Sequence, residues 1–169
     1  MKKSIPIGYE DLKEIIDKNM YYVDKTKILA EMIDNPTKVS LFTRPRRFGK
    51  TLNLSMIRSF FEKELDYQGK QVDNSYLFKD LKISEYGEKY MTHQGQYPVI
   101  NLSLKSAKQS DFEMAYESIK GEIADEFERH TYLTQSNLLT DTEKERFQKM
   151  KDCTAEKIDY AKALLFLSK

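Results

Sequence analysis

Residues 38–54 read KVSLFTRPRRFGKTLNL, and this stretch decides the predicted fold. Its first part, residues 38–43, is short, apolar and partly β-branched, which is typical of a buried strand. A basic loop follows over residues 44–49, and from Lys50 onward apolar residues recur at helical spacing. A strand, a loop and a helix in this order can hold an anion, because the N–H groups of the loop and of the helix N-terminus converge on it.

The end of the loop, Gly49-Lys50-Thr51, carries the side chains that a phosphate site needs. A lysine at this place reaches the outer phosphates of a nucleoside triphosphate, and a threonine hydroxyl binds Mg2+. The pattern G-x-x-x-x-G-K-[ST] is broken at its first position, where Arg44 stands in place of glycine. We therefore expect the first turn to be made differently, with Pro45 fixing its own backbone angle.

Three interpretations of the basic loop stay open from these residues. The strand before it and the apolar helix after it favour a phosphate-binding loop. Gly-Lys-Thr is also compatible with an ordinary helix start that leaves Thr51 and Asn53 on the surface. Arg46 and Arg47 are compatible with a solvated charge run or with a patch that binds nucleic acid.

The remaining chain predicts helices around a small sheet. Residues 97–104 (YPVINLSL) are the second strand candidate, in which Pro98 fits only because it stands at the start. Helices are expected over residues 9–18, 25–33, 111–129, 142–150 and 154–167. Strand, loop, helix, strand and helix in succession predict an α/β fold with a parallel sheet flanked by helices.

Composition narrows the class of protein. The chain has 169 residues, with 28 Lys and Arg against 27 Asp and Glu, which fits one domain and argues against a surface that is basic all over. Cys153 has no disulfide partner, and His93 and His130 lack a zinc-ligand spacing. The longest apolar run, residues 163–167, is far below a membrane span, and no secretory signal begins the sequence. We expect a cytoplasmic protein with no membrane partner.

A family resemblance bears on the missing glycine. Residues 43–54 (TRPRRFGKTLNL), with YVDKT at residues 22–26 upstream, resemble the predicted AAA-ATPase-like family of bacterial and archaeal proteins. Later landmarks fit the same order, namely LF at 77–78, LKI at 81–83 and YPVI at 97–100, so the resemblance covers nearly the whole chain. In this family arginine-proline stands where the first glycine is expected. The resemblance therefore favours the phosphate-binding loop.

The resemblance implies a P-loop NTPase-like fold that binds ATP and Mg2+. Lys50 would bridge the outer phosphates as the catalytic residue, and Thr51 would hold the metal. The nucleotide-binding residues carried over from the family motif are Arg46, Arg47, Phe48, Gly49, Lys50, Thr51 and Leu52. We expect an N-terminal helical segment over residues 1–36 and the front part of the P-loop NTPase domain over residues 37–169.

The implied fold is incomplete in this sequence. Family members carry a stretch resembling LIDEYD, the acidic Walker B strand, which holds Mg2+ and polarises the attacking water, and these residues contain no such stretch. We therefore expect ATP binding with weak or absent hydrolysis, as in a fragment of an ATPase domain. Many relatives continue into a C-terminal nuclease-like domain, which would bring nucleic acid as a partner. The alternative function is a nucleic-acid-contacting or regulatory binding module that uses the basic loop.

Acidic residues outside the loop have open interpretations as well. Asp24 and Lys25 line the base or sugar side of the nucleotide, or else Asp24 caps the helix over residues 25–33. Four acidic residues in the helix over residues 111–129 spread around its axis, which predicts a solvated face rather than a metal site. They are Glu122, Asp125, Glu126 and Glu128.

Overall fold

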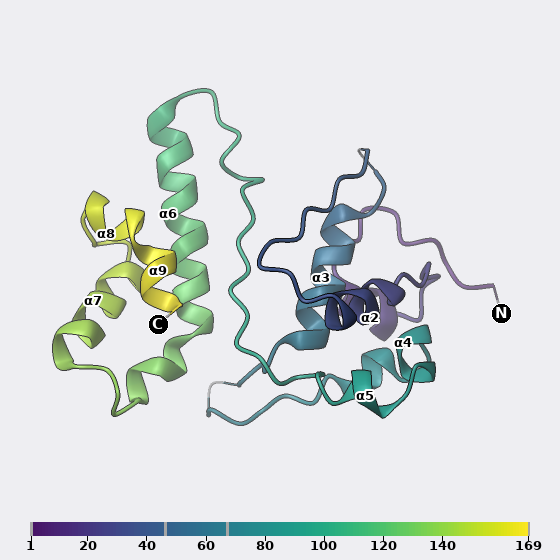
Figure 1. Cartoon of the computed structure of the whole chain (residues 1–169). Helices are drawn as coiled ribbons and strands as arrows, with labels where there is room; N and C mark the ends of the chain where they lie inside the picture. Colours follow the sequence, from purple (N-terminus) through teal and green to yellow (C-terminus); the bar gives the residue numbers. More distant parts are fainter. Residues whose placement is uncertain (1, 46, 67, 169) are drawn as a thin grey trace. The chain divides into compact units, whose positions relative to one another are not determined.

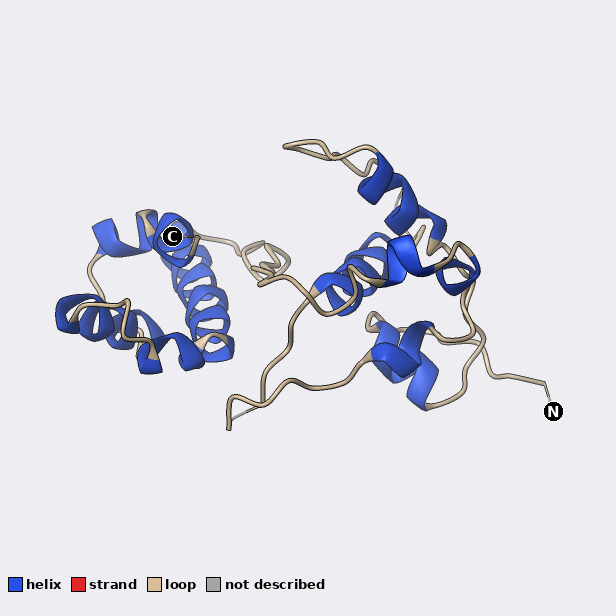
Figure 2. Cartoon of the chain, turned by 60° about the horizontal axis from the view of Figure 1, so that its bottom comes forward, coloured by secondary structure: helices blue, strands red, loops and turns tan. Residues whose placement is uncertain are grey.

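The computed structural model describes residues 2–45, 47–66 and 68–168, and the regular elements in these ranges are helices (Figure 1; Figure 2). Two compact units divide the chain, Met1–Val99 and Ile100–Lys169. Each unit has a hydrophobic core of its own. The expected division between an N-terminal helical segment (residues 1–36) and the front part of a P-loop NTPase domain (residues 37–169) concerns function, and it stays a prediction.

The first unit packs short helices around aliphatic and aromatic side chains. Its elements are α1 (Leu12–Asp17), α2 (Lys27–Asp34), α3 (Lys50–Phe61), the 3-10 turn η1 (Ser75–Phe78), α4 (Lys82–Glu85) and α5 (Glu88–Met91). Phe60, near the end of α3, is fully buried and meets Phe61 and Phe78 edge to face, with 5.1 Å between ring centroids in each pair. Burying one such side chain stabilises the fold by about 1.5–3 kcal/mol. The core therefore fixes the C-terminal end of α3.

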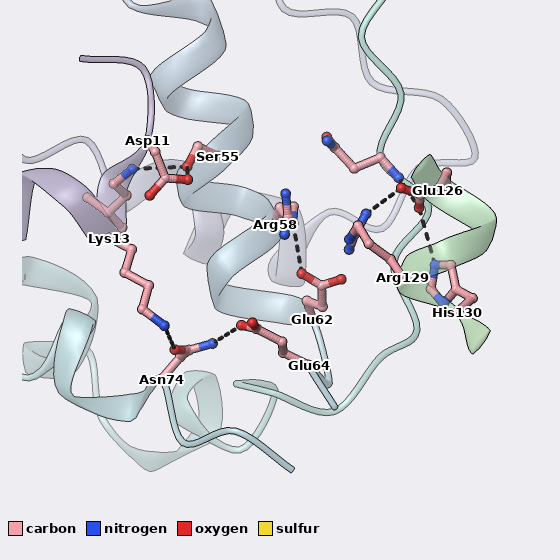
Figure 3. Close-up of polar contacts among 12 residues, drawn as sticks. Asp11, Lys13, Ser55, Arg58, Glu62, Glu64, Asn74, Glu126, Arg129 and His130 are labelled. Carbon is pink, nitrogen blue, oxygen red and sulfur yellow. Dashed lines mark hydrogen bonds and ion pairs between the residues drawn. The ribbon is translucent and has the colours of Figure 1, made fainter. Parts of the chain in front are cut away.

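A polar contact fixes the middle of α3. The Ser55 hydroxyl accepts a hydrogen bond from the backbone N–H of Leu12 at 3.0 Å and donates one to Asp11 at 3.0 Å (Figure 3). Asp11 is also the N-cap of α1, where its side chain accepts from the N–H of Glu14 at 3.1 Å. Helix α3 is thus held to the start of α1 by side chains that also satisfy the first N–H groups of α1.

The second unit is a small helical bundle. Its elements are α6 (Phe112–Arg129), the 3-10 turn η2 (Thr131–Gln135), α7 (Asp141–Lys151), α8 (Lys157–Ala161) and α9 (Ala163–Leu167). Phe127 and Phe147 are fully buried where α6 and α7 meet, with ring centroids 4.8 Å apart. Asp111 caps α6, and Thr140 caps α7 in a capping box with Glu143. These caps explain why both helices begin within a residue or two of their predicted starts.

The predicted parallel sheet is wrong, because the described residues contain no β-strand. Residues 38–43 are irregular and solvent-exposed, with Val39 and Leu41 each 85% exposed. An apolar segment becomes a strand only when a neighbouring strand takes up its backbone N–H and C=O groups. In the described chain, segment 38–43 has no such neighbour, so its apolar pattern does not produce a sheet.

The second strand candidate, residues 97–104, finds other partners. Tyr97 forms an isolated parallel bridge with Glu62, in which its N–H donates to Phe61 at 2.9 Å and its carbonyl accepts from Lys63 at 2.8 Å. Within the second unit, the N–H of Asn101 donates to the Glu126 carboxylate at 2.8 Å. A side chain of α6 therefore occupies the hydrogen-bonding position that a neighbouring strand would have filled.

The remaining helix predictions are largely confirmed. The stretch expected to be one helix over residues 154–167 is split into α8 and α9, which meet at Lys162. In the part of the chain that the structure covers, no helix has both the length and the apolar character needed to cross a bilayer.

Candidate phosphate-binding loop

The basic loop leads directly into α3. Gly49 is the N-cap of α3 in the left-handed conformation, with φ of 73° and ψ of 31°, and its carbonyl accepts the first helical bond from Asn53 at 2.9 Å. Gly49 has no side chain, so it makes no side-chain cap. The N–H groups at this end of α3 have no carbonyl one turn earlier to bond, and the helix dipole adds partial positive charge there. This end of the helix favours an anion.

The loop backbone is unusual at two positions. Arg47 has φ of 68°, in the left-handed region that favours glycine, and Gly49 has φ of 73°. A non-glycine residue pays about 1–2 kcal/mol for this conformation. Left-handed residues in a loop turn N–H groups toward one side, as in the backbone nests that bind phosphate. Strain of this kind concentrates at ligand-binding sites.

Lys50 closes the loop on itself. Its ammonium donates to the carbonyl oxygen of Arg44 at 2.7 Å, across six residues of sequence. The Arg44 guanidinium donates to the carbonyl of Thr43 at 3.3 Å. Arg44, which stands where the motif wants glycine, therefore contributes to the loop through its carbonyl, a group that any residue supplies.

A second lysine reaches the loop from outside it. The Lys25 ammonium donates to the carbonyl of Phe48 at 3.2 Å. A Cβ added to Gly49 would lie 3.5 Å from the same Lys25 nitrogen, so the ammonium packs closely on the left-handed residue. The sequence analysis considered Lys25, with Asp24, as lining the base or sugar side of the nucleotide. The signal for this contact was its place in the YVDKT segment that accompanies the loop.

Asp24 and Thr26, on either side of Lys25, hold the start of α4. The Asp24 carboxylate accepts from the N–H and the hydroxyl of Thr26 at 2.8 and 2.7 Å and from the N–H of Lys82 at 2.7 Å. The fully buried Thr26 hydroxyl accepts from the N–H of Ile83 at 3.0 Å. Burial alone would raise the pKa of Asp24, but the hydrogen bonds from Lys82 and Thr26 hold it below its ordinary value. Asp24 thus accepts from the first N–H of α4 and also binds Thr26, the N-cap residue of α2.

A pocket of about 330 Å3 opens beside the loop. Arg44 and Lys50 contribute its positive charge, and Leu54 and Ile57 of α3 contribute apolar surface. The other lining residues are Ile28, Ser40, Leu41, Phe42, Thr43 and Asn53. Apolar walls with a few converging polar groups are typical of small-molecule sites.

Another pocket, of about 360 Å3, lies at the far end of α3 beside Ser59 and Glu62. The amide groups that line it are already used, since Gln71 donates to the carbonyl of Gly95 at 2.9 Å and Gln94 to that of Asn74 at 3.3 Å. Glu62 pairs with Arg58 at 2.8 Å (Figure 3). The motif residues that are expected to bind phosphate lie at the other end of α3.

The other predicted ligands of the nucleotide differ in what they offer. Arg46 lies outside the described residues. Arg47, Phe48 and Thr51 are exposed, so a ligand can reach them. Leu52 is partly buried against the core of the first unit, which leaves its backbone N–H as the group able to serve an anion. Their roles as ligands stay predictions.

The acidic residues of α6 differ in their surroundings. The described residues contain no group of three or more His, Cys, Asp and Glu that could hold a metal ion. The prediction of a solvated face is wrong for Glu126, whose side chain is 3% exposed and accepts from Arg129, from Asn101 and, at 3.2 Å, from His130 (Figure 3). Even spacing around a helix did not reveal which of these carboxylates faces inward.

Comparison with known proteins agrees with the motif. The family described as "Predicted AAA-ATPase" matches residues 6–166. A relative from Azotobacter chroococcum mcd 1, named "Uncharacterized protein in vnfD 5'region", is 31% identical over 103 residues, which cover 60% of this chain and 17% of the relative. No solved structure shows a significant match. Because the family match extends over nearly all residues, including the loop and α3, the chain belongs to the predicted AAA-ATPase family.

Proposed function

We propose that the loop over residues 44–51 binds the phosphate groups of ATP. The observation that carries this proposal is the contact between the Lys50 ammonium and the carbonyl of Arg44 at 2.7 Å. This contact holds a positive charge inside a loop whose N–H groups and helix dipole also favour an anion. An arriving phosphate can replace the carbonyl as the partner of Lys50 with a stronger, charge-assisted hydrogen bond.

The charges around the loop support a polyanionic ligand. In the described part of the chain, Lys25 and Lys50 donate to backbone carbonyls rather than forming ion pairs with carboxylates. Arg44 and Arg47 are exposed beside them. A triphosphate would neutralise this local charge, and the adjoining pocket of about 330 Å3 offers apolar surface to the nucleoside.

The proposal also covers the binding of Mg2+ and the rate of ATP hydrolysis. The Thr51 hydroxyl, in the exposed first turn of α3, would join phosphate oxygens and water around Mg2+. Mg2+ would neutralise charge on the outer phosphates while Lys50 and the loop N–H groups orient them. Since the acidic Walker B stretch does not occur in these residues, we propose that this chain in the cytoplasm binds ATP and hydrolyses it slowly.

Titration calorimetry with MgATP tests this function. Lys50→Ala should lower the affinity by about 30-fold or more, which corresponds to the 2–4 kcal/mol expected for a charge-assisted contact. Lys63→Ala is the matched control, because Lys63 is an exposed lysine just beyond the other end of α3. Equal MgATP affinity in the wild type and Lys50→Ala would contradict the proposal.

A nucleic-acid-contacting loop is the second candidate, and the exposed Arg44 and Arg47 favour it. Thermal shifts with MgATP and with single-stranded DNA across a salt series separate the two. Stabilisation by MgATP that resists salt supports the nucleotide site. Stabilisation by DNA alone, falling steeply with salt, supports the nucleic-acid patch.

A further inference from the structure

We propose that Lys25 is a second phosphate-binding cation of this loop, a role that rests on the proposed function and extends it. The Lys25 ammonium lies 3.2 Å from the Phe48 carbonyl and would lie 3.5 Å from a Cβ on Gly49. Phe48 and Gly49 are the residues at which the loop becomes α3. An anion bound by the first N–H groups of α3 is therefore within reach of this side chain.

The backbone of Lys25 is anchored on both sides, which reduces the entropy lost when its side chain binds. Asp24 accepts from the N–H groups of Thr26 and Lys82, and Thr26 accepts from that of Ile83. The carbonyl of Lys25 itself accepts from the N–H of Ile28 at 3.1 Å. A side chain presented from a fixed backbone loses less freedom on binding than one on a mobile loop.

The charge of Lys25 is poorly compensated by its neighbours. Asp24 is adjacent in sequence, but its oxygens accept from Thr26 and Lys82. The partner that Lys25 has is a neutral carbonyl in a solvent-exposed setting, and one such bond uses one of its three N–H donors. Lys50 likewise donates to a carbonyl of the same loop. Both ammonium groups thus bring positive charge to carbonyls of one loop, and a phosphate anion bound at the loop would offset that charge.

This assignment separates two roles for Lys25. A lysine that binds phosphate acts on any ligand with a phosphate chain, whereas a lysine that lines the base or sugar side acts only on nucleosides. Inorganic tripolyphosphate carries the charge without a base or a sugar. We therefore expect Lys25 to matter equally for MgATP and for tripolyphosphate.

The test is calorimetry of the whole chain with MgATP and with tripolyphosphate at two salt concentrations. Lys25→Ala and Lys25→Met should each weaken both ligands by about tenfold, as expected for one charge-assisted hydrogen bond, and reduce the salt dependence of binding. Lys25→Arg should restore most of the affinity, because it keeps the charge. Lys27→Ala is the matched control, since Lys27 is an exposed neighbour that pairs with Glu31 at 3.4 Å.

Three results would overturn the assignment. In the first, Lys25→Ala and Lys25→Met bind tripolyphosphate within twofold of the wild-type affinity, while Lys50→Ala no longer binds it. This result removes Lys25 from the site and leaves the proposed function intact. Weaker binding with unchanged salt dependence assigns Lys25 to bracing the loop through Phe48 instead. Failure of the wild type to bind either ligand removes the proposed function and this assignment together.

Discussion

The candidate phosphate loop in the first unit and the Glu126 cluster in the second (Glu126, Arg129, His130 and Asn101) handle charge in opposite ways. At the loop, Lys25 and Lys50 donate to carbonyls, and the side chain of Lys50 is exposed. In α6, the buried Glu126 carboxylate accepts from Arg129, His130 and the N–H of Asn101. Hydrogen bonds from His130 and Asn101 and the charge of Arg129 outweigh burial and keep the pKa of Glu126 below its ordinary value.

The difference in burial separates the proposed ligand site from a structural cluster. A buried charge must have all its partners within the fold, because leaving it unpaired costs several kcal/mol. An exposed charge that faces a neutral carbonyl loses little if that contact is exchanged for a ligand. We therefore expect substitutions in the Glu126 cluster to change stability without changing binding, and substitutions in the loop to change binding with little change in stability.

The largest effect is expected for Glu126→Ala. Removing this carboxylate takes away the acceptor that Glu126 provides to Arg129, to the buried His130 and to the N–H of Asn101. The free energy of unfolding should fall by about 3–5 kcal/mol, as for other broken buried pairs. Urea denaturation measures the loss, with the exposed neighbour Asp125→Ala as control. A change below about 1 kcal/mol would mean that the cluster is not the structural element we describe.

Lys50→Ala should have the opposite effect, lowering MgATP affinity while leaving stability nearly unchanged. Its MgATP affinity should fall by about 30-fold or more, while its free energy of unfolding stays within about 0.5 kcal/mol of wild type, because the contact with Arg44 is solvent-exposed. Calorimetry and urea denaturation on the same preparation give both numbers. A large loss of stability would show that Lys50 stabilises the folded loop and is not simply available to bind a ligand.

The two regions also differ in how far the sequence predicts them. The loop was located correctly, and α3 begins at Lys50 as predicted, because glycine, lysine and threonine have local conformational and chemical preferences. The caps Asp111 and Thr140 are likewise local, so their helices were found. Glu126 was wrongly predicted to lie on a solvated face. Its burial depends on Asn101 and His130, whose positions only the folded chain reveals.

The prediction of a parallel sheet was wrong for the same reason, because it depended on contacts between distant residues. The apolar pattern of residues 38–43 and 97–104 is a preference for strand conformation, and pairing requires a neighbour that the pattern does not name. Lys25 was located near the candidate site through its segment, but its contact with Phe48, 23 residues later in the sequence, is visible only in the folded chain. Local signals predicted elements and their ends, whereas contacts between distant residues decided architecture and burial.

A smaller effect is expected for Asp24→Ala, which removes the carboxylate that accepts from the first N–H of α4 and from Thr26. Stability at neutral pH should fall by about 1–2 kcal/mol, as for other caps. The pKa of Asp24 is below its ordinary value of 3.8, so its contribution is present above that pH and is lost as the pH falls through the lower value in the folded state. The gap between wild type and variant should therefore close in acid. A gap that stays constant from pH 7 to pH 2 would contradict the charged cap; Asp80→Ala is the exposed control.

The smallest effect tests the strain in the loop itself. Arg47 has φ of 68°, so Arg47→Gly relieves about 1–2 kcal/mol of left-handed strain but adds backbone entropy to the unfolded chain. The two terms nearly cancel, and the free energy of unfolding should rise by no more than about 1 kcal/mol. MgATP affinity should fall only as far as one exposed charge contributes, a few-fold at low salt. If Arg47→Gly instead weakened MgATP as much as Lys50→Ala, the guanidinium would be a direct ligand, and the loop would depend on side-chain charge more than on backbone shape.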